Sequence, residues 1–246
     1  MKEQRIALIT GASRESGLGF ATAKQLAAKG YTVLISGRNM ISLEDLVEKA
    51  HGEKLELVPL KLDVTSEQSA AEAAKFIRQE FGKLDLLINN AIDGASFDKN
   101  AFANIKDIEM EIVEQALAVN VIGAWRMIRH MAPLLTLSDS GKVLNLSSEL
   151  GKITDMETIN AYGGMSLYGL TKTAINALTV KAAQDLKSDG ISVNSVAPGF
   201  TATYPGFAEQ GARPVKDSVE GIIYAAMLPK DGPTGVWFSD RKEIGW

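Results

Sequence analysis

The fold is decided by one stretch, Thr10-Gly-Ala-Ser-Arg-Glu-Ser-Gly-Leu-Gly19, which joins the apolar run Ile6-Ala-Leu-Ile9 to an Ala-rich amphipathic segment. Glycines at such a junction let backbone N–H groups approach a pyrophosphate, and the N-terminus of the following helix adds partial positive charge. An ordinary tight turn is the alternative, but a position between a first strand and a first helix favours nucleotide binding. The expected contacts are Gly11, Ser13, Arg14, Gly17, Leu18 and Gly19.

Short apolar runs and helical patterns alternate along the rest of the chain. The runs predict strands at 6–9, 31–35, 55–58, 86–88, 143–146, 191–196 and 236–238, and apolar residues spaced by three or four positions predict helices over 20–29, 43–50, 67–81, 108–135 and 171–186. This alternation predicts a single-domain α/β Rossmann fold over residues 1–246. We expect a doubly wound parallel sheet of about seven strands with helices on both faces, and ligands at the carboxyl ends of the strands.

The composition excludes several classes of function. A chain of 246 residues with 46% hydrophobic residues can build one large core, and a formal net charge of −4 gives no reason to expect nucleic acid or an anionic membrane as a partner. Cysteine is absent and the two histidines, His51 and His130, are far apart, so we expect no metal site. No apolar segment reaches the ~18 residues of a membrane span and no signal core is visible, so we expect a cytoplasmic protein.

The stretch Tyr168-Gly-Leu-Thr-Lys172 places a phenol and an ammonium four residues apart in a helical pattern. That spacing puts both side chains on one face of the helix. Since a neighbouring cation favours the phenolate, we expect a lowered pKa for Tyr168 and proton exchange with a substrate oxygen. The alternative is a helix that carries the two residues by chance.

The end of the second predicted strand, Ser36-Gly37-Arg38-Asn39, bears on the choice of cofactor. A free ribose 2′-OH usually meets Asp or Glu about 20 residues beyond the glycines, and no carboxylate stands there. Arg38 and Arg14 are therefore predicted to bind the 2′-phosphate of NADP(H), unless both are solvated surface arginines.

Further motifs follow the glycine stretch in a fixed order: Asn89-Asn90-Ala91, Asn120, Ser147-Ser148, Tyr168 with Lys172, and Pro198-Gly199. With this order and spacing the chain resembles the short-chain dehydrogenase/reductase family over nearly its whole length. Its closing segment, 228–246, resembles the carbonyl-reductase-like branch.

The resemblance implies a catalytic role for four residues. Tyr168 would be the general acid or base, and Lys172 would lower its pKa and hold the nicotinamide ribose. Ser148 would bind the substrate oxygen, and it is preferred to Ser147 because the family's serine is usually the second of the pair. Asn120 would hold a water that links Lys172 to solvent.

The resemblance also implies the remaining cofactor contacts. They are Asp63 with Val64 against the adenine, Asn90 with Ala91 near the adjoining ribose, and Pro198-Gly199 with Thr201 beside the nicotinamide. The chain departs from the family pattern at Glu15 and Ser16, which lengthen the glycine loop, and at Ile92, where the family usually has Gly. It also has extra residues over 152–165, which predict a flap near the site or a surface excursion.

The implied activity is reversible hydride transfer between NADP(H) and a small-molecule carbonyl or alcohol. A reductase for an acyl-carrier thioester or a sugar, and a non-catalytic nucleotide sensor, are the alternatives. A hydrolase using Ser148 is disfavoured because no Gly-x-Ser-x-Gly surrounds it.

Two further questions stay open in the sequence. The substrate pocket is expected to involve Ile153, Met156, Met165, Phe200, Tyr204 and Phe207, although each would also fit core packing. A homo-oligomer through the helices predicted at 108–135 and 171–186 is compatible with the family, although the extra residues before Tyr168 would obstruct that face.

Overall fold

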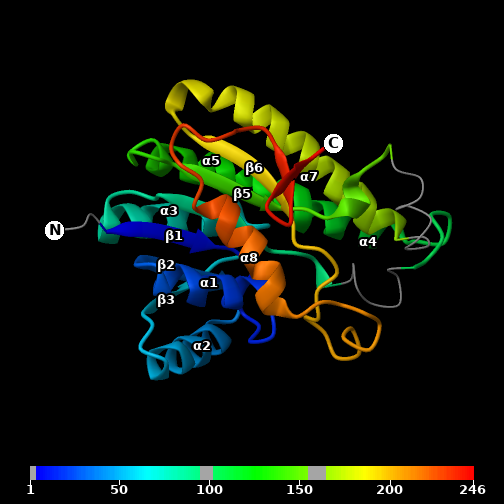
Figure 1. Ribbon diagram of the computed structural model, residues 1–246, viewed down its shortest axis with the longest axis horizontal. Coiled ribbons are helices and arrows are strands. Elements are labelled where there is room, and N and C mark those ends of the chain that lie inside the picture. The colour runs from blue at the N-terminus through cyan, green and yellow to red at the C-terminus, as the bar shows by residue number, and fades with distance from the viewer. Residues whose placement is uncertain (1–3, 95–101, 155–164) are drawn as a thin grey trace.

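The computed structural model describes residues 4–94, 102–154 and 165–246 and contains one twisted sheet between two layers of helices (Figure 1). The strands are β1 (Arg5–Ile9), β2 (Tyr31–Gly37), β3 (Leu57–Lys61), β4 (Leu86–Asn89), β5 (Lys142–Leu146), β6 (Ser192–Ala197), β7 (Trp237–Ser239) and β8 (Lys242–Ile244). Their order across the sheet is β3-β2-β1-β4-β5-β6-β7-β8. The strand order reverses between β1 and β4, so a crevice is expected at the carboxyl ends of these two strands.

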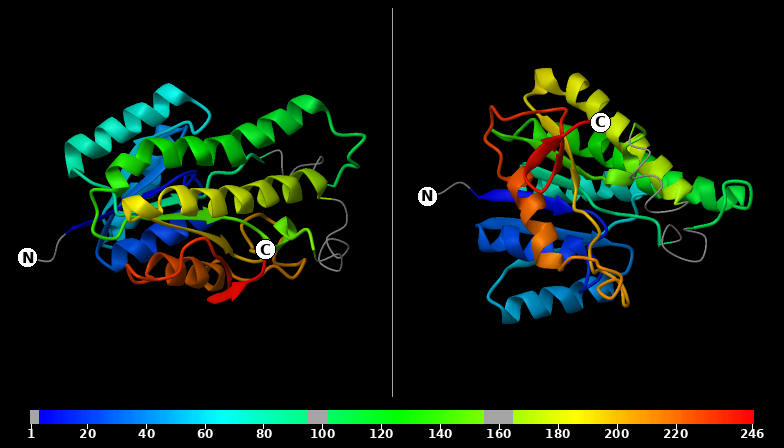
Figure 2. Two further views of the ribbon diagram at one scale, coloured as in Figure 1. Left: turned by 90° about the horizontal axis from the view of Figure 1, so that it is seen from above. Right: turned by 45° about the vertical axis from the view of Figure 1, so that its right-hand side comes forward.

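The helices are α1 (Leu18–Ala28), α2 (Met40–Gly52), α3 (Glu67–Phe81), α4 (Met110–Leu117), α5 (Ala124–Leu135), α7 (Ser166–Asp185) and α8 (Val215–Ala226), with a π-helix, η2 (Ala118–Gly123), between α4 and α5, and short 3-10 helices η3 (Glu149–Gly151) and η4 (Lys187–Asp189). One buried apolar cluster packs α3, α5 and α7 on one face of the sheet, and a second packs α1, α2 and α8 on the other (Figure 2). The strands are apolar on both faces because both are covered. The predicted doubly wound fold is confirmed.

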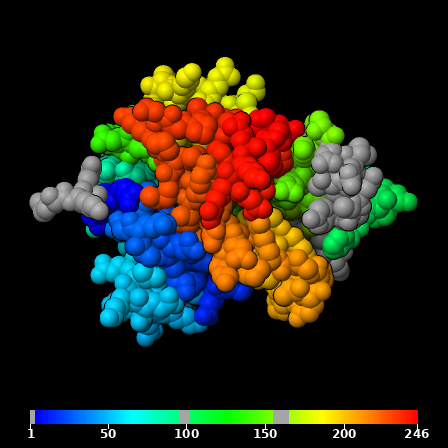
Figure 3. All heavy atoms as spheres, viewed as in Figure 1, coloured from blue at the N-terminus to red at the C-terminus, as the bar shows by residue number. Residues whose placement is uncertain are grey.

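The C-terminal edge of the sheet differs from the prediction of about seven strands. An eighth strand, β8, pairs antiparallel with β7 after a turn in which Asp240 and Arg241 have φ of 45° and 66°. Trp246 then stacks on the buried Trp237, with ring centroids 5.7 Å apart. In the space-filling view the C-terminal residues, coloured orange and red, cover the middle of one face (Figure 3). The three-residue β8 was missed because it is too short to show a period.

The helix predicted over 108–135 is in fact divided into α4, η2 and α5. Asn120 lies in the π-helical middle part, where wider turns weaken the regular hydrogen-bond ladder. The helix predicted from 171 begins at Ser166 as α7, so Tyr168 and Lys172 both lie on it.

The outer helix surfaces carry apolar side chains. Ile122 and Trp125 are 50% and 62% exposed, and Leu170 is 54% exposed. Within the described ranges, no helix combines the length and the apolar character needed to cross a membrane. Homo-oligomerisation stays a prediction.

Candidate active site

A cavity of about 610 Å³ lies where the glycine loop, the β4 end and α7 meet. Most of the residues predicted to hold the cofactor line it. They are Gly11, Ser13, Arg14, Gly17, Leu18, Gly19, Arg38, Asp63, Val64, Asn90, Ala91, Tyr168, Lys172 and Pro198. Segments far apart in the sequence are thus brought to one surface by the parallel sheet.

The glycine loop packs tightly against the residues that follow β4. Gly11 has φ 66°, and a Cβ built there would lie 2.5 Å from Cα of Ala91. A side chain is therefore excluded both by conformation and by contact. Gly17 is the N-cap of α1, whose N-terminus meets the cavity. Free N–H groups and the helix dipole at this position suit an anion such as a pyrophosphate.

The two extra residues of the glycine loop have definite contacts. The carboxylate of Glu15 forms an ion pair with Lys49 of α2, and Ser16 Oγ donates a hydrogen bond of 3.1 Å to the carbonyl of Thr203. Beside them the guanidinium of Arg14 lies 4.0 Å from the ring centroid of Tyr204. The extension therefore ties the glycine loop to the segment that follows β6.

That segment contains the aromatic residues predicted as pocket candidates. Tyr204 lines the cavity, whereas Phe200 and Phe207 pack within the segment itself, with ring centroids 5.2 Å apart. Among the described residues the pocket prediction thus applies to Tyr204 and not to the two phenylalanines. Met156 and most of the predicted flap lie outside the described residues; Ile153 is 68% exposed.

Asn90 joins the β4 end to the glycine loop. Its Nδ2 donates to the carbonyls of Thr10, at 2.7 Å, and of Gly11, at 3.0 Å. Asp63 accepts hydrogen bonds from the backbone and hydroxyl of Thr65 at 2.9 and 2.7 Å. Burial acts to raise the pKa of Asp63, but these bonds and the charge of Arg38 outweigh it and the pKa is lowered. Arg38 itself is exposed on the cavity wall.

The two serines after β5 point to different partners. Ser147 is buried and its Oγ donates a 2.6 Å hydrogen bond to Asn176 Oδ1. Ser148 is only partly buried, and its side chain is hydrogen-bonded to Tyr168. The structure therefore brings Ser148, and not Ser147, to the phenol.

The direction of the Tyr168 pKa shift reverses the sequence-based prediction. Burial raises the pKa of Tyr168 to about 12, and the hydrogen bond with Ser148 offsets only part of this effect. The ammonium of Lys172 lies 5.4 Å from the Tyr168 ring centroid and donates a 2.7 Å hydrogen bond to the Leu146 carbonyl. The prediction was wrong because removal from water, which spacing along a helix does not reveal, dominates. The phenol is protonated at neutral pH.

Burial also lowers the pKa of Lys172 to about 8, from 10.5. Between these values the unfolded chain binds more protons than the folded one, so the free energy of unfolding should rise with pH through this window. We expect the wild type to gain stability relative to Lys172→Met between pH 8 and 10. Denaturant titrations of both proteins across this range measure the difference, and parallel pH profiles would contradict it.

Asn120 is held by its side chain from two sides. Its Oδ1 accepts a 2.7 Å hydrogen bond from the backbone N–H of Asp93, and its Nδ2 donates to Thr171 Oγ1 at 3.3 Å. It does not line the large cavity, but with Lys172 and Asn89 it lines a second one of about 10 Å³. Asn89 Oδ1 has no hydrogen-bond partner among the described residues. A space of this size and polarity suits a single water.

The loop after β6 is fixed by Arg213, which the sequence did not single out. Arg213 Nε donates to the Pro198 carbonyl at 2.9 Å and to Ser218 Oγ at 3.0 Å, and its Nη1 pairs with Asp240 at 2.6 Å. Gly199 has φ 74°, and a Cβ there would lie 2.9 Å from this guanidinium. Arg213 therefore positions the loop expected beside the nicotinamide.

Thr201 was predicted to bind the carboxamide, but the structure gives it other partners. Its hydroxyl donates to the Gly199 carbonyl at 2.9 Å and lies 2.7 Å from Ser218 Oγ. Of the described residues in this loop, Pro198, Thr203 and Tyr204 line the cavity, and Gly199 and Thr201 do not.

A family model described as short chain dehydrogenase matches residues 5–209, which include the glycine loop, the Tyr168/Lys172 helix and the first part of the loop after β6. The chain belongs to the short-chain dehydrogenase family. Its relatives include "Short-chain dehydrogenase anuI" of Penicillium roqueforti, 35% identical over 88% of this chain and 89% of that protein. Another is (+)-neomenthol dehydrogenase of Arabidopsis thaliana, 29% identical over 98% of this chain and 97% of that protein.

Solved structures share the fold. A short chain dehydrogenase from Mycobacterium smegmatis aligns with a TM-score of 0.82 at 22% identity, covering 99% of this chain and 94% of that one, and supports the fold alone. Salutaridine reductase from Papaver somniferum aligns with a TM-score of 0.78 at 25% identity, covering 96% of this chain and 99% of that one.

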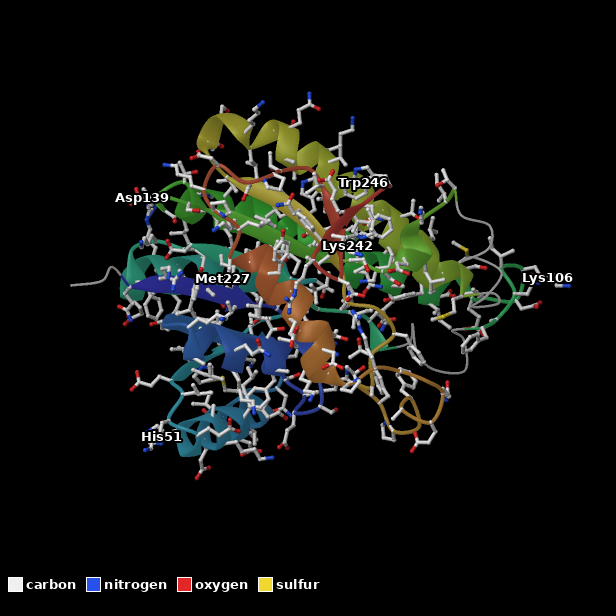
Figure 4. The ribbon with its side chains drawn as sticks, viewed as in Figure 1. His51, Lys106, Asp139, Met227, Lys242 and Trp246 are labelled. Carbon is white, nitrogen blue, oxygen red and sulfur yellow. The ribbon has the colours of Figure 1, made fainter. Side chains whose placement is uncertain are left out.

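Neither histidine of this short-chain dehydrogenase takes part in the site. His51 is exposed at the end of α2, on the periphery of the molecule (Figure 4), and His130 contacts Glu67 at 2.8 Å. In the described part of the chain, no three His, Asp or Glu side chains are grouped to hold a metal ion.

The cavity-lining residues of this dehydrogenase that the sequence did not single out include Asp93 and Gln115. Asp93 follows the Asn89-Asn90-Ala91 motif by two positions, so a polar residue directly after a strand-end motif was the available signal. No comparable signal marks Gln115, which lies in an amphipathic helix among other polar residues.

Proposed function

We propose that the protein is an NADP(H)-dependent oxidoreductase that reduces an aldehyde or ketone to the alcohol, with Tyr168 as the general acid. The observation that carries this proposal is the half-buried, protonated phenol of Tyr168, hydrogen-bonded to Ser148 and lining one cavity together with Lys172 and the glycine loop. The relatives support oxidoreduction, since their names describe a dehydrogenase and a reductase.

The residues of the cavity fit a nicotinamide dinucleotide. Gly11 and Gly17 line the cavity at the α1 N-terminus, which would suit a pyrophosphate. Asn90 and Asp63 line the same cavity and would contact the adenosine. When bound, the nicotinamide supplies a hydride to the carbonyl carbon.

The protein's own residues then handle the carbonyl oxygen. As negative charge grows there, Tyr168 transfers its phenolic proton to this oxygen and the Ser148 hydroxyl donates a hydrogen bond to it. Lys172, protonated below its pKa of about 8, stabilises the phenolate that remains. A water in the small cavity beside Asn120 and Lys172 would return a proton to the site.

The preference for NADP(H) rests on Arg38. This guanidinium is exposed on the cavity wall directly after β2, where the strand ends at Gly37 without a carboxylate. Arg14 lines the same cavity, but its guanidinium is stacked on Tyr204, which makes Arg38 the stronger candidate for a 2′-phosphate.

The direct test is consumption of NADPH, followed by absorbance, with a panel of aldehydes, ketones, diketones and quinones, beside the same panel with NADH. We expect oxidation of NADPH by several members and much slower oxidation of NADH. Equal rates with both cofactors would contradict the NADP(H) assignment. Binding of NADPH with no turnover of any carbonyl would favour the narrower alternatives, an acyl-thioester or sugar reductase or a non-catalytic NADP-binding regulator.

A further inference from the structure

One carboxylate in the cavity is not used by the mechanism above. Asp93 lines the cavity and is only 5% exposed. Its Oδ1 accepts a 2.8 Å hydrogen bond from Gln115 Nε2, whereas its Oδ2 has no hydrogen-bond partner among the described residues. A buried carboxylate oxygen without a donor is unfavourable. Oδ2 itself is covered in this structure, but Asp93 lines the cavity, so a turn of its side chain would bring this oxygen to a donor on a bound molecule.

Hydrogen bonds connect Asp93 to the catalytic helix. Its backbone N–H donates to Asn120 Oδ1 at 2.7 Å, and Asn120 Nδ2 donates to Thr171 Oγ1 at 3.3 Å. Thr171 Oγ1 in turn donates to the backbone carbonyl of Tyr168 at 2.8 Å. Asp93 is therefore anchored against the turn of α7 that carries Tyr168, which places it in the catalytic part of the cavity.

The contact with Gln115 decides which chemistry Asp93 can recognise. Because Gln115 holds Oδ1 from α4, Oδ2 remains to accept a further hydrogen bond. An acceptor or an anion at this position would be repelled, and an apolar group would leave the oxygen unsatisfied. Only an O–H or N–H donor satisfies the remaining hydrogen-bonding capacity of the Asp93 carboxylate.

We propose that Asp93 binds a hydrogen-bond donor of the substrate, so that the preferred substrates are carbonyl compounds with a hydroxyl or amino group near the carbonyl. The inference rests on the proposed carbonyl reduction and names the substrate class for that site. A site built to bind a polar group discriminates strongly against the analogue that lacks it, because its own buried group is then left unpaired.

Matched ketones test the assignment with NADPH as the reductant. Propiophenone carries a methyl group where 2-hydroxyacetophenone has a hydroxyl and 2-aminoacetophenone has an amine. We expect wild type to favour a donor-bearing ketone over propiophenone in kcat/KM, and we expect Asp93→Leu to reduce this ratio of kcat/KM values roughly 10- to 100-fold. If the kcat/KM advantage over propiophenone disappears in Asp93→Leu for only one of the two ketones, that ketone identifies the recognised donor as a hydroxyl or an amine.

A second variant covers failure of the first to fold. Asp93→Asn keeps an oxygen for Gln115 and puts an N–H₂ group in place of Oδ2, so it should lose the preference for the amine most strongly. An equal loss for all three ketones in the folded variants would overturn the inference, because it would assign Asp93 to the cofactor or to the scaffold. An unchanged preference would overturn it as well.

A binding measurement separates this inference from the proposed function. Calorimetric titration of wild type and Asp93→Leu compares 1-phenylethane-1,2-diol with 1-phenylpropan-1-ol and needs no turnover. Tighter binding of the diol by wild type alone would support the donor site even if no ketone were reduced, in which case the proposed function would fail separately. Equal binding of the two alcohols by wild type would show that Asp93 does not bind a substrate hydroxyl. If the ketone assay also showed no preference for the amine, the inference would be overturned.

Discussion

Tyr168→Phe should lower the turnover of carbonyl compounds by roughly 10²- to 10⁴-fold, the usual contribution of a general acid, while NADPH still binds. The variant removes only the hydroxyl that is hydrogen-bonded to Ser148, and it keeps the half-buried ring in its place on α7. Loss of one such bond costs on the order of 1 kcal/mol of stability, so the fold should persist. Single-turnover oxidation of bound NADPH measures the step directly.

The matched control for this variant is Tyr224→Phe. Tyr224 lies on α8, is 39% exposed and packs edge-on against Phe238, so its hydroxyl is remote from the proton transfer. Wild-type turnover is expected for it. If Tyr168→Phe also kept near-normal turnover, Tyr168 would not be the general acid.

Arg38→Leu should weaken NADPH binding roughly 10- to 100-fold and leave NADH binding nearly unchanged. A charge-assisted hydrogen bond to a phosphate contributes about 1.5–3 kcal/mol, and only NADPH carries the 2′-phosphate. Dissociation constants from the quenching of protein fluorescence, measured for both cofactors at one salt concentration, give the comparison.

Arg78→Leu is the control for a lost surface charge, since Arg78 is exposed on α3 and does not line the cavity. It should alter the binding of neither cofactor. An equal weakening of NADPH and NADH in Arg38→Leu would indicate a general electrostatic role for Arg38 in place of recognition of the 2′-phosphate.

The structure supports the choice of Ser148 as the partner of Tyr168 and reverses the predicted direction of the Tyr168 pKa shift. The choice of Ser148 over Ser147 depended on a family resemblance. Only the packing shows that Ser147 is hydrogen-bonded to Asn176 and that Ser148 is hydrogen-bonded to Tyr168. The pKa of Tyr168 was predicted in the wrong direction, because helical spacing reports which groups are neighbours and says nothing about how much water surrounds them.

The sequence by itself determined the fold class, the position of the glycine loop and the placement of Tyr168 and Lys172 on one helix, because each depends on short-range patterns: strand and helix periods, glycines at a strand–helix junction, and a spacing of four residues. Only the tertiary structure decided the π-helix at Asn120, the anchoring of Pro198 by Arg213 and the unpaired oxygen of Asp93. These features depend on burial and on contacts between segments far apart in the chain. Such properties belong to the packed molecule, because many distant residues together exclude water from a group.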